Sequence, residues 1–390
     1  MSHVMNTYAR LPVAFTHGQG AWLWDTEGKK YLDGLSGIAV NTLGHAHPKL
    51  TAAMSAQIGK LMHCSNVYQV PGQEVLADKL CELTHMEEVF FSNSGCEANE
   101  AAIKLARMFG HQRDITNPCI IVMEKAFHGR TLATLSATGN RKVQVGFEPL
   151  VTGFVRVPYN DLDAVRQVAA NNSNVVAVLV EPIQGEGGIR TLDIEYLQQL
   201  RGICDEQNWL LMLDEVQCGI GRTGKWFAHQ HAGILPDVMT LAKGLGSGMP
   251  IGACLTAGKA AKVFAAGNHG STFGGNPLAC TAGITTLSVI EADNLLAHAD
   301  MLGRFIQQAF RTQLNGVAGV FEVRGQGLMI GVELTKPCGD LVKLALAKGL
   351  LINVTADNVI RLLPPLIMSE SEAQQLVDGL CPLIKEFLQL

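Results

Sequence analysis

Between about residues 70 and 258, short apolar runs alternate with segments whose apolar residues recur at helical spacing. The expected strands are EEVFFSN (87–93), CIIVMEK (119–125), VVAVLVEP (175–182), LLMLDEV (210–216), VMTLAKG (238–244) and IGACLTAG (251–258). The expected helices are EVLADKLCEL (74–83), CEANEAAIKLARMFG (96–110), DLDAVRQVAA (161–170) and EYLQQLRGICDEQN (195–208). Apolar strands separated by helices form mostly parallel sheets that are covered on both faces. We therefore expect an α/β fold built on such a sheet.

The two ends of the chain have a different pattern, which indicates a second, smaller α+β domain. After a helix that starts near Pro277, two long helices (about 281–292 and 294–314) precede two apolar segments (320–334 and 349–365) and a closing amphipathic helix. Near the N-terminus, residues 13–34 alternate and contain two glycine turns, which favours a small antiparallel piece. The expected division is an N-terminal segment that contributes to the small domain (1–55), a large domain (56–285) and a C-terminal small domain (286–390).

Composition excludes several classes of protein. With 390 residues, 47% hydrophobic and 17% charged, the chain is typical of a globular enzyme with a large core. A net charge of −5, mixed along the sequence, predicts no nucleic-acid partner, and no apolar run approaches the roughly 18 residues of a membrane helix. The N-terminal residues lack a signal-peptide apolar region, and ten cysteines without a C-x-x-C pair favour a reducing compartment. We expect a cytoplasmic protein.

Two charged residues end apolar strands, where chemistry is expected because ligands bind beyond the carboxyl ends of parallel strands. Asp214 follows a run of uncharged residues, and a buried carboxylate needs a positive partner. Lys243 has no other charged residue between Val238 and Thr256. A lysine in apolar surroundings has a lowered pKa that suits it for Schiff-base formation. Taken alone, Lys243 reads as a surface charge; taken with Asp214, it reads as a catalytic residue.

A helix start supplies a third element of a site. Ser94, Gly95 and Cys96 lie where a strand meets a helix, and Ser94 with Glu97 fits a capping box. The free N–H groups of such a helix start also bind phosphate. An amine, a carboxylate and a phosphate cup together meet the needs of pyridoxal 5'-phosphate: the amine forms the Schiff base and the carboxylate pairs with the protonated ring nitrogen.

Two other motifs point less specifically to function. The segment GIGRTGKW (219–226) matches both G-x-G-x-x-G and G-x-x-x-x-G-K, but a P-loop needs Ser or Thr where Trp226 stands. A dinucleotide fingerprint would open a helix, so we expect a bent loop here and keep a nucleotide-binding enzyme as a remote alternative. The pairs His45/His47 and His229/His231 lack a third ligand at a recognisable spacing, so no metal site is expected.

In its order of motifs, the chain resembles the class III (ornithine-type) pyridoxal-phosphate aminotransferases. The motifs are WLWDTEGKKYLDGLSGIAVNTLGHAHP, SNSGCEANEAAIKLAR, KAFHGRT, EPIQGEGG, LDEVQCGIGRTG, LAKGLGSGMPIGA, GSTFGGNPLAC and VIRLLPPL. They run through essentially the whole chain. The resemblance implies fold type I of the pyridoxal-phosphate-dependent transferases, in which a large cofactor-binding domain with a mostly parallel sheet joins a smaller α+β domain.

The resemblance also implies a role for each site residue. Lys243 would carry the cofactor and shuttle a proton, Asp214 would pair with the ring nitrogen, and Gln217 would contact the phenolic oxygen. The other implied contacts are Phe127 and Val216 on the two ring faces, Ser94, Gly95 and Cys96 on the phosphate with Thr272 from the neighbouring subunit, and Ser271, Gly37 and Ile38 on the substrate side. Arg130 would bind the α-carboxylate of an acetylated diamine and Arg361 that of glutamate or 2-oxoglutarate, with Glu186 pairing with Arg361 in its absence. Each of these residues also has a purely structural interpretation in the core, in a turn or on the surface.

Within the family, the chain is most similar to the bacterial acetylornithine branch. That implies a cytoplasmic homodimer with shared active sites, which moves the terminal amino group of N2-acetyl-L-ornithine to 2-oxoglutarate in arginine biosynthesis. Ornithine-specific members have a tyrosine near the segment where this chain has Gly37 and Ile38, and its absence favours an acylated substrate. Succinylornithine, ornithine, 4-aminobutyrate and succinyl-diaminopimelate remain alternative donors. A relative that has lost catalysis is a further alternative, against which Lys243, Asp214 and Phe127 argue. Cys96 departs from the Thr or Ala of many relatives, which is tolerable if backbone amides bind the phosphate.

Overall fold

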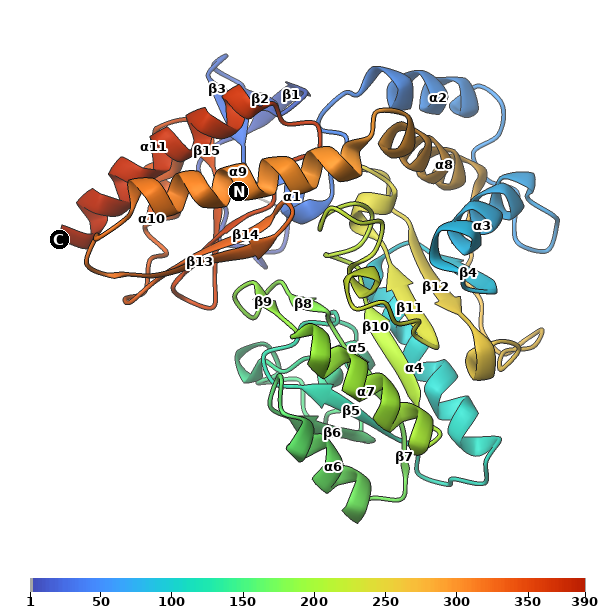
Figure 1. Ribbon diagram of the computed structural model, residues 1–390. Helices are drawn as coiled ribbons and strands as arrows, with labels where there is room; N and C mark the ends of the chain where they lie inside the picture. Colours follow the sequence, from blue (N-terminus) through green and yellow to red (C-terminus); the bar gives the residue numbers. More distant parts are fainter. Residues whose placement is uncertain (1–2, 390) are drawn as a thin grey trace.

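A seven-stranded sheet forms the centre of the larger part of the molecule (Figure 1). The computed structural model describes residues 3–389. Across the sheet the strands are β4 (Glu88–Ser92), β12 (Gly252–Thr256), β11 (Val238–Leu241), β10 (Leu210–Asp214), β7 (Val175–Val180), β5 (Cys119–Met123) and β6 (Phe154–Val157). Six of the strands run in one direction, and β12 runs in the opposite direction between β4 and β11. The expected mostly parallel sheet is therefore confirmed, and β6 adds an edge strand to the expected set.

Helices cover both faces of this sheet, and alternate residues of each central strand face opposite layers. On one face Ile121 and Leu211 pack against α6 (Leu162–Asn171) and α7 (Ile194–Glu206). On the other, Ile120 packs against α4 (Gly95–His111) and α5 (Leu132–Ala137). This double cover explains why β5, β7, β10, β11 and β12 are buried along their whole length.

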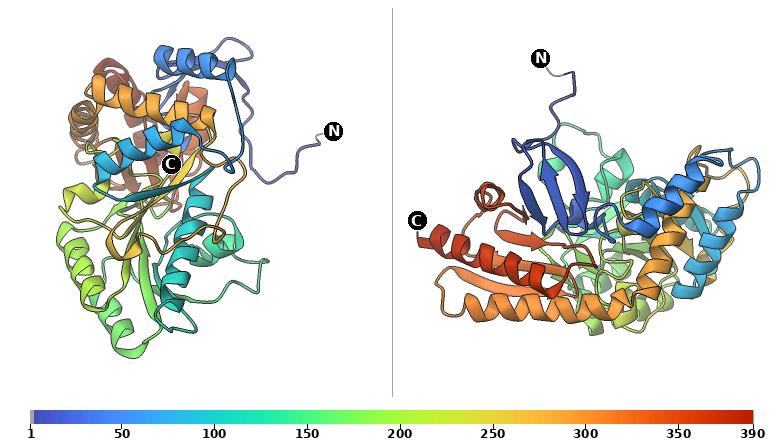
Figure 2. Two further views of the ribbon diagram at one scale, coloured as in Figure 1. Left: turned by 90° about the vertical axis from the view of Figure 1, so that its right-hand side faces the viewer. Right: turned by 90° about the horizontal axis from the view of Figure 1, so that it is seen from above.

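The second part of the molecule contains two further four-stranded sheets (Figure 2). One has the order β13 (Val320–Gln326), β14 (Met329–Leu334), β17 (Val359–Leu362) and β16 (Asn353–Thr355), all antiparallel. The other joins β1 (Phe15–Gln19), β2 (Trp22–Asp25) and β3 (Lys30–Asp33) to β15 (Leu350–Leu351). Strands β3 and β15 pair in parallel although more than 300 residues separate them in the chain. The N-terminal hairpin thus lies beside C-terminal elements, and the division into an N-terminal segment, a large domain and a small domain stays a prediction.

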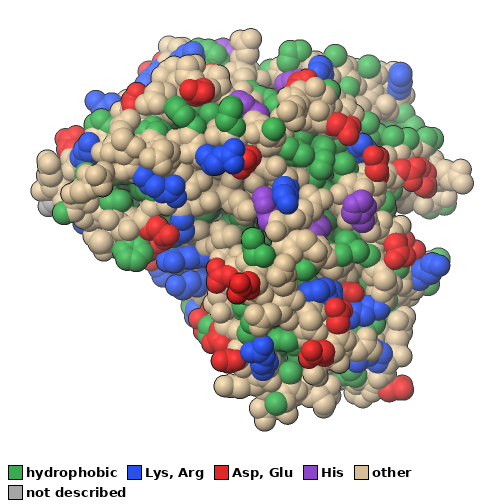
Figure 3. Space-filling model, in the orientation of Figure 1, with side chains coloured by type: hydrophobic (Ala, Val, Ile, Leu, Met, Phe, Trp, Pro, Cys, Tyr) green, Lys and Arg blue, Asp and Glu red, His purple; other side chains and the backbone are tan. Residues whose placement is uncertain are grey.

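The remaining helices connect and cover these sheets. They are α1 (Ser36–Ala39), α2 (Pro48–Ile58), α3 (Pro71–Thr84), α8 (Pro277–Ala292), α9 (Leu295–Gln313), α10 (Leu341–Ala347) and α11 (Glu370–Gln389). A short hairpin, β8 (Ile183–Gln184) and β9 (Arg190–Thr191), completes the elements that bear on the site. Across the face shown in Figure 3, positive and negative side chains are interspersed. Within residues 3–389, no helix has both the length and the apolar character that crossing a bilayer requires.

Candidate active site

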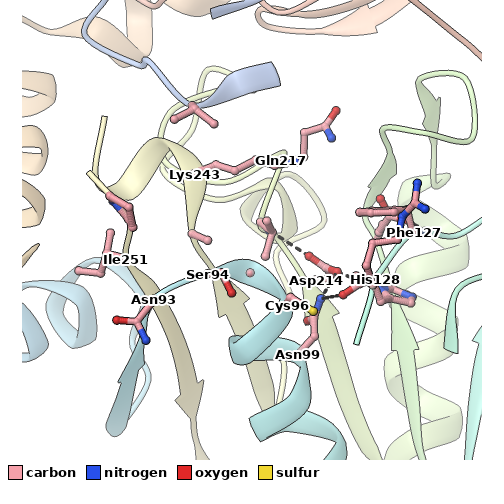
Figure 4. Close-up of a pocket in the computed structure, with 18 of the residues that line it drawn as sticks. Asn93, Ser94, Cys96, Asn99, Phe127, His128, Asp214, Gln217, Lys243 and Ile251 are labelled. Atoms are coloured by element: carbon pink, nitrogen blue, oxygen red, sulfur yellow. Dashed lines mark hydrogen bonds and ion pairs between the residues drawn. The ribbon is translucent and has the colours of Figure 1, made fainter. Parts of the chain in front are cut away.

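A cavity of about 410 Å³ opens at the carboxyl end of the seven-stranded sheet (Figure 4). Nine residues singled out in the sequence line it: Ser94, Gly95, Cys96, Phe127, Arg130, Asp214, Val216, Gln217 and Lys243. They come from four separate segments, each of which leaves a strand of the same sheet at its carboxyl end. The fold therefore brings together groups that are up to about 150 residues apart in the chain.

Lys243 lies two residues beyond β11, in a backbone conformation that is unusual for a residue with a side chain. Its φ of 42° falls in the left-handed region, and such strained residues concentrate at functional sites. Within residues 3–389, no hydrogen bond or ion pair holds its amine. Burial, followed by the positive charge of Arg361, lowers the pKa of Lys243. The site thus presents an amine that loses its proton more readily than an ordinary lysine.

Asp214 ends β10 with its carboxylate 4% exposed, at the floor of the cavity. Oδ1 accepts from the backbone N–H of Val216 (3.1 Å), and Oδ2 accepts from Asn99 Nδ2 (2.7 Å) and lies 2.8 Å from His128 Nδ1. Asn99 Oδ1 in turn accepts from the hydroxyl of Thr240 (2.7 Å). These bonds fix the carboxylate in place without a lysine or arginine partner, so it can pair with a cation in the cavity.

The start of α4 forms a close-fitting cup. Ser94 caps the helix by accepting from Glu97 N (3.2 Å), as expected. The Glu97 carboxylate reaches back to the backbone N–H of Asn93 (2.5 Å), one residue earlier than a capping box requires. A Cβ on Gly95 would come within 2.6 Å of Val216 Cγ1, so only glycine lets the backbone approach here. The helix-start amides at the cup are the groups that bind phosphate in other proteins.

Phe127 and Arg130 form one wall of the cavity. The backbone N–H of Phe127 donates to Glu181 Oε1 (2.9 Å), and the Arg130 guanidinium lies 5.7 Å from the Phe127 ring centroid. Glu181, the residue after β7, is 5% exposed. Burial, reinforced by the nearby charge of Asp214, raises the pKa of Glu181 to about 7. Arg130 itself is exposed at the mouth, where a carboxylate can reach it.

Arg361 and Glu186 form an ion pair beside this cavity. Arg361 lies on β17 and is 1% exposed, and its Nη1 donates to Glu186 Oε1 (2.6 Å) and to Gln217 Oε1 (3.3 Å). Because Gln217 also lines the cavity, this contact connects the ion pair to it. The pairing of Glu186 with Arg361 that the resemblance implied is thus present in the structure.

Four other expected residues do not line the cavity. Gly37 and Ile38 lie in α1 with φ values of 65° and 67°, and Val40, two residues after Ile38, lines the cavity instead. Ser271 accepts from Asn93 Nδ2 (3.2 Å), and Asn93 is a cavity residue. Thr272, the next residue, is exposed and does not line the cavity. The substrate and phosphate roles of these four residues stay predictions.

The glycine motif after Asp214 forms a bent loop with no helix after it, as expected. Gly221 and Gly224 have φ values of 83° and 87°, and the next regular element is a short 3₁₀ turn at Ala228–His231. Glu215, for which the sequence suggested no role, anchors this loop. Its carboxylate is buried and accepts from the backbone N–H groups of Ala228 (2.6 Å) and His229 (2.9 Å).

Sequence reasoning missed several residues of the site, among them Asn99, His128 and Glu181. Glu181 offered a signal, since it ends a strand as Asp214 does. Asn99 is a polar residue on the alanine-rich buried face of α4, which is also unusual. Residues 3–389 contain no cluster of histidine, cysteine and carboxylate side chains suited to a metal ion.

The chain matches known proteins along almost its entire length. The profile of the family described as aminotransferase class-III matches residues 4–384. An acetylornithine aminotransferase of Nitrosomonas europaea is 60% identical over 389 residues, covering 100% of this chain and 99% of that protein. One of Aquifex aeolicus is 49% identical over 381 residues, covering 97% and 99%.

Solved structures agree with these matches. The ornithine aminotransferase of Toxoplasma gondii superposes with a TM-score of 0.94 at 32% identity, over 98% of this chain and 94% of that one. The acetylornithine aminotransferase of Elizabethkingia anophelis superposes with a TM-score of 0.87 at 35% identity, over 99% and 97%.

Proposed function

The chain belongs to the class III aminotransferases, and from that premise we propose that it moves the terminal amino group of N2-acetyl-L-ornithine to 2-oxoglutarate. The products are N-acetyl-L-glutamate 5-semialdehyde and L-glutamate, a step of arginine biosynthesis. The observation that carries the donor is the name shared by similar curated relatives. Relatives that are 47–60% identical over at least 95% of this chain are named acetylornithine aminotransferase.

The residues present fit pyridoxal 5'-phosphate. A buried carboxylate, an amine with a lowered pKa and a helix start that only glycine fits all face one cavity. When bound, the cofactor supplies an electrophilic carbonyl carbon and a ring that accepts electrons. Lys243 would hold the carbonyl carbon and Asp214 the ring nitrogen. The remaining contacts would come from Gln217 on the phenolic oxygen, Phe127 and Val216 on the ring faces, and Ser94, Gly95 and Cys96 on the phosphate.

The chain's own residues divide the work of the reaction. Lys243 Nζ removes a proton from the donor carbon that bears the amino group and later gives a proton back, and its lowered pKa makes the free amine that performs this transfer more accessible than in an ordinary lysine. The Asp214 carboxylate gives a negative charge to the end of the site opposite Lys243. Arg130, exposed at the mouth, binds the α-carboxylate of the acetylated donor, since a guanidinium matches a carboxylate in a bidentate manner.

The second substrate uses a different arginine. Arg361 binds the α-carboxylate of glutamate or 2-oxoglutarate, and Glu186 takes that place while the acetylated donor is bound. One cavity thereby accepts two substrates that differ in charge. The alternation suits a ping-pong reaction, in which the amino donor leaves before the acceptor enters.

We also propose that the active unit is a homodimer in the cytoplasm. Three exposed apolar side chains lie in two loops that meet beside the cavity residue Asn93: Val67 (84% exposed), Tyr68 (70%) and Phe273 (58%). Asn66 ties their two loops together by donating to the backbone carbonyls of Ser271 and Gly274. A second copy would cover this surface and bring its Thr272 to the phosphate cup of the first. All ten cysteines are free, which fits a reducing compartment.

A panel of amino donors tests the proposed function. Glutamate formation from 2-oxoglutarate is followed with N-acetylornithine, succinylornithine, ornithine, 4-aminobutyrate and succinyl-diaminopimelate, with Lys243→Ala as the inactive control. We expect kcat/KM to be at least about tenfold higher for N-acetylornithine than for ornithine, because an arginine pocket without a partner for a free α-ammonium group disfavours that donor. A higher kcat/KM for ornithine or 4-aminobutyrate would overturn the donor assignment.

A further inference from the structure

The guanidinium of Arg361 has three acceptors, which come from three different elements. Nη1 donates to Glu186 at 2.6 Å and to Gln217 at 3.3 Å, and Nη2 donates to Asn353 Oδ1 at 2.8 Å. Its Nε is buried and has no partner within residues 3–389. A buried guanidinium with an unpaired N–H group can donate a further hydrogen bond to an incoming anion.

The three acceptors differ in how firmly they are placed. Glu186 lies in the turn between β8 and β9, followed by Gly187 and Gly188, and its side chain is 39% exposed. Asn353 lies on β16 and pairs directly with Arg361 across the sheet. A side chain on the opposed position of a paired strand is held by the backbone hydrogen bonds of the sheet. Asn353 is therefore a fixed partner, and Glu186 is a removable one.

The acceptors also differ in what happens to them when a substrate carboxylate arrives. Glu186 and the incoming carboxylate are both negative and compete for the same guanidinium, so Glu186 must leave. Gln217 lines the cavity and is assigned there to the cofactor's phenolic oxygen. Asn353 does not line the cavity, so it competes with neither the substrate nor the cofactor.

From this arrangement we infer that Asn353 is a positioning residue for the dicarboxylate substrate. It holds Arg361 in the same orientation when Glu186 is bound and when it is displaced. As a neutral amide it accepts a hydrogen bond without cancelling the positive charge that the substrate needs. This inference rests on the proposed function, because that function makes Arg361 the glutamate-binding arginine.

The test compares Asn353→Ala and Asn353→Asp with a control from the same sheet region, Asn358→Ala. Asn358 donates to the backbone carbonyl of Leu334 (2.7 Å) and to Glu333 Oε1 (3.5 Å), and it makes no hydrogen bond to Arg361. The variants are loaded with pyridoxal phosphate. Calorimetry then gives the affinity for glutarate, steady-state kinetics give KM for the keto-acid acceptor, and single-turnover kinetics give kcat/KM for N-acetylornithine. Glutarate is a five-carbon dicarboxylate without a keto group, so its binding reports on the arginine without turnover.

We expect both Asn353 variants to weaken glutarate binding, and to raise KM for the keto-acid acceptor, by about tenfold, the value of one hydrogen bond to a charged group. The Asp variant keeps the shape but neutralises Arg361, so it tests the charge separately. In both Asn353 variants, kcat/KM for N-acetylornithine should stay within about twofold of the wild-type value. In Asn358→Ala, the kinetic constants for both substrates should stay within about twofold of wild type.

The inference is overturned if Asn353→Ala binds glutarate as tightly as wild type, or if both substrates are affected equally. It is also overturned if the wild-type protein binds no glutarate. If the wild type binds glutarate but does not transaminate N-acetylornithine, the proposed function fails, while the glutarate affinities still decide the role of Asn353.

Discussion

At the scale of single residues, Asp214 is held in position by hydrogen bonds and not by a lysine or arginine partner. Its hydrogen bonds to Asn99 and to the Val216 backbone, with His128 at 2.8 Å, set where the carboxylate points. None of these partners is a lysine or an arginine, so the strongest charge interaction open to Asp214 is with a cation inside the cavity. Under the proposed function this cation is the protonated ring nitrogen of the cofactor.

Replacing Asp214 by Ala should therefore lower kcat for glutamate formation by about a thousandfold, because a preorganised charge at the reacting group contributes this much. Asp214→Asn, which keeps the shape, should lose almost as much. Both variants should still bind the cofactor covalently, as read from the visible spectrum. Wild-type-like turnover in Asp214→Asn would show that the charge is not needed.

The pKa of Lys243 predicts how capture of the cofactor depends on pH. Lysine reacts as the free amine, and burial and Arg361 lower its pKa, so capture by the apoprotein should reach its plateau below the usual lysine range near 10.5. Arg361→Leu removes a positive neighbour and should move the midpoint to higher pH. Glu186→Gln removes a negative neighbour and should move it to lower pH. Stopped-flow absorbance measures both, and shifts in the same direction would contradict this account.

The sequence pointed to Asp214 and Lys243 because each ends an apolar strand, where a charge is conspicuous. It did not point to Asn99 or His128, whose importance comes from contact with Asp214 across 115 and 86 residues of chain. Such contacts depend on which strands become neighbours. Local sequence pattern does not encode that order.

At the scale of elements, the cup at the start of α4 depends on one backbone approach. Gly95→Ala would bring a methyl group within 2.6 Å of Val216, so one of the two segments must move. We expect cofactor affinity to fall by at least about tenfold through loss of phosphate contacts, measured by fluorescence titration of the apoprotein.

Gly202→Ala is the matched control for that change. Gly202 lies inside α7, and a Cβ there meets nothing within 4 Å. Alanine at this helix position should raise the free energy of unfolding by about 0.5–1 kcal/mol and leave cofactor binding unchanged. Equal cofactor affinities in Gly95→Ala and wild type would mean that the cup does not hold the phosphate.

Periodicity predicted the buried strands and most helices, because a doubly covered sheet requires continuous apolar runs. The helix expected to start near Pro277 and the one expected over 281–292 form the single helix α8, and α9 begins at Leu295, one residue from its expected start. The edge strand β6 was not expected, since it is only partly buried and its sequence, FVRV, is short. The glycine-rich loop matched nucleotide motifs by letter, but the positive φ values and the Glu215 anchor show that it is a bent connection.

At the scale of the whole molecule, a substitution in the exposed apolar surface around Val67 tests the proposed dimer. Val67→Asp places a charge in the proposed dimer interface and should convert a species of twice the chain mass into monomers, as measured by sedimentation velocity. Activity should fall with the dimer, because Thr272 from the second copy would be lost from the phosphate cup. Ile194→Asp, at an apolar residue 51% exposed at the start of α7, is the control and should remain dimeric. A monomeric wild type with full activity would contradict the shared site.

Borohydride reduction of the cofactor-loaded protein, followed by peptide mass spectrometry, tests the central assignment most directly. Reduction makes a Schiff base permanent, so the modified lysine can be read from the peptide that carries the added mass. We expect a phosphopyridoxyl group on Lys243 and none on the peptide containing Lys225 of the glycine-rich loop. A modification at another lysine, or Lys243→Ala protein that still traps the cofactor, would contradict this assignment.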